Sequence, residues 1–150
     1  MTDDAPLARA RRPTRLVGRR LPASSSVLSA AAIAWLGFLV HNVADLPNQT
    51  LLSPETLWPS LVTVALLVLY ATGSVRVAGI GLFVWTLMNL AGGVSSVLPL
   101  SLLPFEPEQT VRHYSFHLLS AATQVPLLVV SYRLAVATPS APAREAGRGT

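Results

Sequence analysis

The chain has 150 residues, of which 51% are hydrophobic and only 12% are charged, and its formal net charge is +4. Soluble domains carry about 25% charged residues, so this composition argues against a soluble protein. Cysteine is absent, which excludes disulfides, thiolate metal sites and cysteine nucleophiles. All eleven basic residues are arginine, a usage that is typical of GC-rich bacterial genomes.

The first segment, residues 1–22, is polar and holds six of the eleven arginines together with three prolines. We expect a disordered tail there. A basic pI can indicate nucleic-acid binding, but arginines clustered beside a long apolar stretch are more typical of a topology signal and of contact with anionic lipid headgroups. No nucleic-acid partner is therefore expected.

Residues 23–136 form the expected transmembrane domain. Apolar segments suited to helices cover about 26–46, 56–74, 77–98 and 113–136. About 20 helical residues cross a bilayer, and these runs lack the alternation of barrel strands. The prediction is an all-α integral membrane four-helix bundle with up-down-up-down order. The first apolar run exceeds the 7–15 residues of a signal peptide, so we expect it to be retained. Residues 137–150 are rich in Ala, Pro and Gly and are expected to be a second disordered tail.

The arginines also predict the orientation of the bundle in the membrane. If the N-terminus is cytoplasmic, ten of the eleven arginines lie on that side, and only Arg112 lies outside. The positive-inside rule then predicts that both termini are cytoplasmic. We expect the protein to lie in the inner membrane of the cell. The loops that contain residues 47–55 and 99–112 face outward in this arrangement.

Polar and small residues recur at helical spacing along three of the segments. The first carries Ala30, Ala34, Gly37, His41 and Asp45; the third carries Gly81, Trp85, Asn89, Gly92 and Ser96; the fourth carries His113, His117, Ala121 and Gln124. Small residues allow close helix approach and polar ones bond across helices. We expect these three helices to make the functional contact, with the second facing lipid. Asn89 and Gln124 are expected mainly to join helices.

The histidines gather near the outer side. His41 and His117 both lie about five residues inside the outer ends of their helices, about 7–8 Å deep, so they are predicted to meet. His113 lies one turn from His117 on the same face, and Asp45 lies one turn from His41. The candidate cluster is His41, Asp45, Glu106, Glu108, His113 and His117.

Three functions remain open for this cluster. It suits a divalent metal site, because imidazole and carboxylate are ligands of zinc, iron and copper(II). Alternatively, His41 and His117 bind one b-type haem from facing helices. The favoured interpretation is a small accessory or structural subunit of a membrane assembly, with membrane-protein partners or further copies of itself. A transporter component is a further alternative, although repeated halves are missing. No nucleophile elbow, phosphate loop or pair of catalytic carboxylates within the membrane appears, so an enzyme is not favoured.

Overall fold

The computed structural model describes residues 22–99 and 108–137, and these residues form four helices. The helices are α1 (Ser24–Asp45), α2 (Pro54–Ala71), α3 (Val75–Val97) and α4 (Val111–Val136). All four are long and apolar enough to cross a membrane, which confirms the predicted all-α membrane bundle. The two expected tails, residues 1–22 and 137–150, fall almost entirely outside the described residues.

Local sequence explains where the helices begin and end. Pro54 occupies the first turn of α2, where its missing N–H costs nothing, and Glu55 beside it complements the helix dipole. The Thr110 side chain caps α4 by accepting a hydrogen bond from the backbone N–H of His113. Gly73 follows α2 with φ +94°, which a glycine adopts without strain, and this permits the tight turn into α3. Each helix begins two residues before its predicted start, because its first turn includes polar or charged residues that lie outside the apolar run, namely Ser24 and Ser25, Glu55, Arg76 and Arg112.

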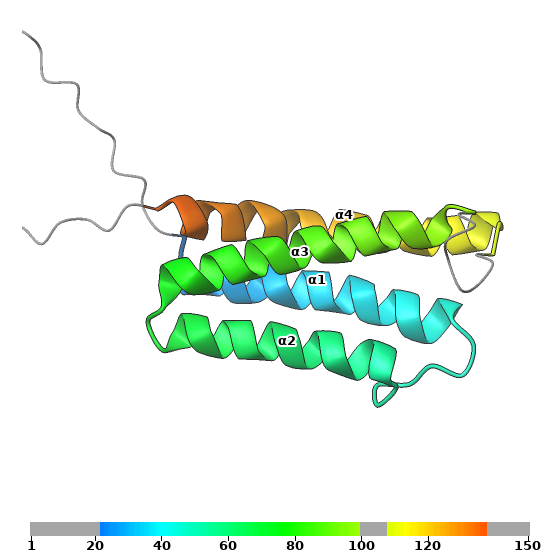
Figure 1. Ribbon diagram of the computed structural model, residues 1–150, viewed down its shortest axis with the longest axis horizontal. Helices are drawn as coiled ribbons and strands as arrows, with labels where there is room; N and C mark the ends of the chain where they lie inside the picture. Colours follow the sequence, from blue (N-terminus) through cyan, green and yellow to red (C-terminus); the bar gives the residue numbers. More distant parts are fainter. Residues whose placement is uncertain (1–21, 100–107, 138–150) are drawn as a thin grey trace, which may run out of the picture. The chain divides into compact units, whose positions relative to one another are not determined.

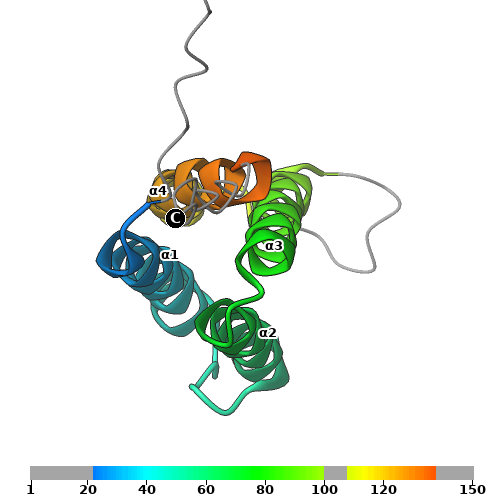
Figure 2. The ribbon, with the colours of Figure 1, turned by 90° about the vertical axis from the view of Figure 1, so that its left-hand side faces the viewer.

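The four helices run alternately up and down, and α4 lies between α1 and α3 (Figures 1 and 2). The closest packing joins α4 to both α1 and α3, whereas α2 packs mainly on α3 and only lightly on α1. In α2 only Thr56 is buried. α2 therefore has the least protein contact of the four helices, which is consistent with the expectation that it faces lipid.

The buried apolar core lies in one half of the bundle. Its members are Val27, Ala30, Ala31, Ala34, Leu82, Leu127 and Leu134. These residues belong to the half that contains the beginnings of α1 and α3 and the end of α4, and we call it the packed half. Gly37 of α1 lies directly against Thr123 of α4, and Gly79 of α3 lies against the backbone of α4 at Leu134. The small residues thus let neighbouring helices approach closely.

The predicted stripe on α3 does not face one partner. Gly81 packs on the side chain of Leu66, and Trp85 donates from Nε1 to Thr63 Oγ1 over 3.1 Å, so this part of the stripe contacts α2. Buried Ala78, Leu82 and Thr86 lie on a different stripe of α3. The expectation of a contact restricted to the first, third and fourth helices was therefore wrong for Gly81 and Trp85.

Candidate functional site

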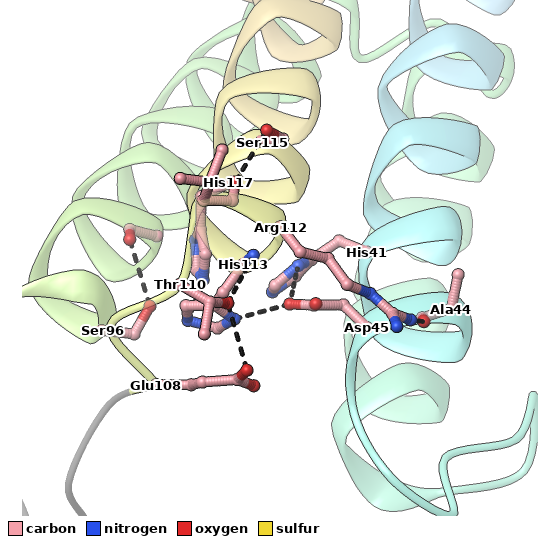
Figure 3. Close-up of polar contacts among 12 residues, drawn as sticks. His41, Ala44, Asp45, Ser96, Glu108, Thr110, Arg112, His113, Ser115 and His117 are labelled. Carbon is pink, nitrogen blue, oxygen red and sulfur yellow. Dashed lines mark hydrogen bonds and ion pairs between the residues drawn. The ribbon is translucent and has the colours of Figure 1, made fainter.

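The candidate site lies at the opposite end of the bundle, where α1 and α3 end and α2 and α4 begin. We call this the histidine half. Asp45 is the last residue of α1, and His41 lies one turn before it. His113 and His117 lie on successive turns at the beginning of α4. Figure 3 shows these four side chains pointing toward one another from the two helices.

Asp45 is the centre of the cluster. Its side chain is only 2% exposed, and its Oδ2 lies 2.6 Å from His113 Nδ1. The same oxygen is 3.6 Å from His41 Nδ1, which is beyond hydrogen-bond distance. A carboxylate at a helix C-terminus faces the negative end of the helix dipole, so Asp45 requires such a partner. The contact with His113 supplies it.

The two histidines of α4 continue the chain of contacts away from Asp45. His113 Nε2 lies 3.1 Å from His117 Nε2, a hydrogen-bond distance. The ring of His117 in turn lies 4.2 Å from the ring of His41, centroid to centroid. The predicted approach of His41 to His117 is therefore confirmed. The result is a continuous path from Asp45 through His113 to His117.

Other residues hold the cluster from its exposed side. Arg112 Nη2 donates to the carbonyl oxygen of Ala44 over 2.7 Å, and so satisfies a free carbonyl at the end of α1. Arg112, the single arginine expected on the outer side, thus links α4 to α1. The carboxylate of Glu108 accepts a hydrogen bond from the Thr110 hydroxyl rather than from a histidine. Glu106 lies outside the described residues.

A cavity of about 450 Å³ lies beside this cluster between α1, α3 and α4. His41 and His117 line it, and so do the two intramembrane amides expected to join helices, Asn89 and Gln124. Gln124 Nε2 donates to the carbonyl of Ala34 on α1 over 3.4 Å, whereas Asn89 Nδ2 donates only within its own helix, to Trp85 O. Gln124 therefore does join helices as expected, but Asn89 does not, and both also face the cavity.

Asn42 is a buried polar residue that the sequence reading missed. Its Nδ2 donates to Thr56 Oγ1 and to the carbonyl of Glu55, both at 3.1 Å, and so links α1 to the beginning of α2. Asn42 also lines the cavity. Its position directly after His41 on a membrane span was the signal available in the sequence, because polar groups there need a partner.

Neither predicted cofactor fits these side chains as they lie. Among the described residues, no three His, Asp or Glu side chains are placed to hold one metal ion. A haem between His41 and His117 would need space for the porphyrin and for two metal–nitrogen bonds of about 2 Å. The two rings, 4.2 Å apart at their centroids, leave no such space. The arrangement instead provides a hydrogen-bonded chain that ends at a cavity.

Comparison of the chain with known protein families, with curated proteins and with solved structures finds no match.

Proposed function

We propose that this small membrane protein binds a lipid-soluble molecule with a polar head in the cavity of the histidine half. The observation that supports the proposal most is a gradient of polarity along the cavity wall, from exposed apolar side chains to buried polar ones. Met88, Val94 and Leu118 line it and are 59–73% exposed, whereas Asn42 and Gln124 line it and are buried. On a membrane-spanning helix, exposed apolar side chains face lipid.

The gradient suits an amphiphile that enters from the bilayer. Its apolar part would remain near Met88 and Leu118, and its polar head would reach His41 and His117. A volume of about 450 Å³ lies within the range of about 300–1,000 Å³ that is usual for small-molecule sites. Such sites are mostly apolar with a few placed polar groups, as here. Polar groups inside a membrane span are costly and usually have a function. Under this proposal, their function is to bind the polar head of the ligand.

A cavity-filling substitution tests the proposal. Gly93 lines the cavity, and a Cβ added to it would lie 3.7 Å from His117 Nδ1. Gly93→Leu therefore places a side chain where the polar head is expected. Ala91→Leu is the matched control, because Ala91 is exposed on the same helix and is not part of the cavity wall.

The measurement is mass spectrometry of molecules that co-purify with the protein in mild detergent. We expect one amphiphile to be enriched with the wild type and with Ala91→Leu, and to be lost from Gly93→Leu. Equal enrichment in all three proteins would contradict the proposal, as would no enrichment in any of them.

A structural role as an accessory subunit is the second candidate, and the packing of α2 favours it. The apolar side chains of Leu61, Val64 and Val68 on α2 are exposed, and only Thr56 of that helix is buried. Exposed apolar side chains of this kind are compatible with lipid and with a neighbouring membrane protein. A partner captured by cross-linking from α2, with no bound amphiphile, would favour this function over the first.

We further propose that both termini lie in the cytoplasm and that the histidine half faces outward. The distribution of arginines supports this orientation, since Arg112 is the single arginine expected outside. The arginines of residues 1–22 would then contact anionic headgroups of the inner leaflet. Reporter fusions at the two ends test the orientation, and an external signal from either end would contradict it.

A further inference from the structure

We infer that the cavity selects ligands whose polar head donates a hydrogen bond, such as a phenol with a long apolar substituent. This inference rests on the proposed function and specifies the class of molecule bound. It follows from the chain Asp45–His113–His117, in which the hydrogen-bonding role of each atom determines the role of the next.

The chain begins with a group that can only accept. An ionised carboxylate has no proton to donate, so the contact of 2.6 Å requires His113 to carry its proton on Nδ1 and to donate it to Asp45 Oδ2. A neutral imidazole has one protonated nitrogen and one lone pair. With Nδ1 protonated, the Nε2 of neutral His113 is therefore an acceptor.

The same reasoning determines the state of His117. Its Nε2 lies 3.1 Å from the Nε2 of His113 and must donate to it, since two lone pairs do not form a hydrogen bond. The Nδ1 of neutral His117 then carries a lone pair. This atom is the one that a Cβ added to Gly93, on the cavity wall, would meet at 3.7 Å. The cavity is thus provided with an acceptor, and a ligand hydroxyl is its complement.

The other ionisable groups near the chain leave this polarity unchanged. On α1, His41 Nδ1 is 3.6 Å from Asp45, too far for a hydrogen bond. On the α4 side, Arg112 donates to Ala44 O, the Tyr114 hydroxyl donates to Gln109 Oε1, and Glu108 accepts from Thr110. At the beginning of α2, Glu55 accepts from Gln49. On α3 the single ionisable residue is Arg76, near the start of the helix and so at the opposite end of the bundle.

Asp45 controls the preference without touching the ligand. Neither Asp45 nor His113 is part of the cavity wall, whereas His117 is. Removing the negative charge of Asp45 therefore removes the constraint on which ring nitrogens of His113 and His117 carry a proton, and it leaves the cavity wall unchanged. Asp45→Asn is nearly isosteric, and its amide can accept from His113 or donate to it, so both polarities become available.

The test compares 2-decylhydroquinone with its dimethyl ether, which has the same ring and alkyl chain but carries methoxy groups in place of the hydroxyl donors. Binding is measured in nanodiscs of uncharged lipid at about pH 8.5, where free imidazoles are neutral. For the wild type we expect the hydroquinone to bind about tenfold more tightly, because the ether leaves the Nδ1 lone pair without a partner. Glu108→Gln is the control, since Glu108 lies beside the chain but outside it, and it should keep the tenfold preference.

Asp45→Asn should reduce the preference to less than about threefold while the ether binds as it does to the wild type, which shows that the cavity is intact. Equal binding of the two probes to the wild type would overturn this inference and leave the proposed function standing. A preference that survives Asp45→Asn unchanged would also overturn it. Binding of neither probe would contradict the proposed function as well.

Discussion

The packed half and the histidine half of the bundle use the same helices in opposite ways. In the packed half, Val27, Leu82 and Leu134 are at most 1% exposed and fill the space between helices. In the histidine half, a cavity of about 450 Å³ takes the place of such a core, and buried side chains are polar. The difference indicates that one half provides stability, which allows the other to hold costly polar groups and an open space.

The largest effect is expected from removing a core side chain in the packed half. Leu134 belongs to α4 and is 1% exposed. Leu134→Ala should lower the free energy of unfolding by about 2–5 kcal/mol, through lost transfer energy and the cavity left behind. Leu118→Ala, on the same helix but 73% exposed in the histidine half, should leave it nearly unchanged. Thermal unfolding in one detergent compares them, and equal losses would remove the distinction between the halves.

Adding a single methyl group should also destabilise the protein in the packed half but not in the histidine half. A Cβ at Gly79 would lie 2.6 Å from Leu134 Cβ and 2.8 Å from the backbone nitrogen of Ala135. Overpacking of this kind costs about 1–3 kcal/mol, so we expect that loss for Gly79→Ala. A Cβ at Gly92 meets no atom within 4 Å, and Gly92→Ala should retain wild-type stability. Loss of stability in Gly92→Ala, measured by the same unfolding assay, would show that the cavity wall is tightly packed after all.

The contacts of Asn42, which are one of the links between α1 and α2, should contribute less. Asn42→Ala removes the hydrogen bonds to Thr56 Oγ1 and to the Glu55 carbonyl. Interhelical hydrogen bonds in membranes average about 0.6 kcal/mol, so the loss should be about 1 kcal/mol. Asn89→Ala is the control, because the Asn89 amide donates only within α3. If the two variants have the same unfolding temperature, the Asn42 contacts contribute nothing to stability.

The smallest effect is expected at the hydrogen bond between Trp85 and Thr63. Thr63→Val keeps the shape of the side chain and removes the Oγ1 atom that accepts the hydrogen bond from Trp85 Nε1. We expect a loss of about 0.6 kcal/mol together with easier cross-linking of α2 to other chains, since this bond is one of the few that hold α2. Unchanged stability and unchanged cross-linking would indicate that α2 is held by apolar packing alone.

The sequence predicted the features that depend on one helix at a time. Four apolar runs of suitable length predicted four spans, and counting residues from the helix ends placed His41 and His117 at one depth. Both results depend only on length and rise per residue. Spacing alone also predicted that the first helix makes close contacts through Ala30, Ala34 and Gly37.

Features that depend on how helices rotate against one another were not predictable in this way. Spacing placed Gly81, Trp85 and Asn89 on one stripe but did not show that Gly81 and Trp85 contact α2 while Asn89 faces a cavity. The cavity itself arises from what three helices leave empty. The roles of Arg112 and Glu108 likewise depend on the approach of α4 to the end of α1.

The protonation states of the histidine rings test the central claim most directly, namely that Asp45 sets the polarity of the cavity through His113. Nitrogen-15 NMR of the full chain in nanodiscs at about pH 8.5, with assignment by His113→Gln and His117→Gln, reads which ring nitrogen carries the proton. We predict a proton on Nδ1 of His113 and on Nε2 of His117, with Nδ1 of His117 unprotonated. A proton on Nδ1 of His117 in the wild type would contradict the account.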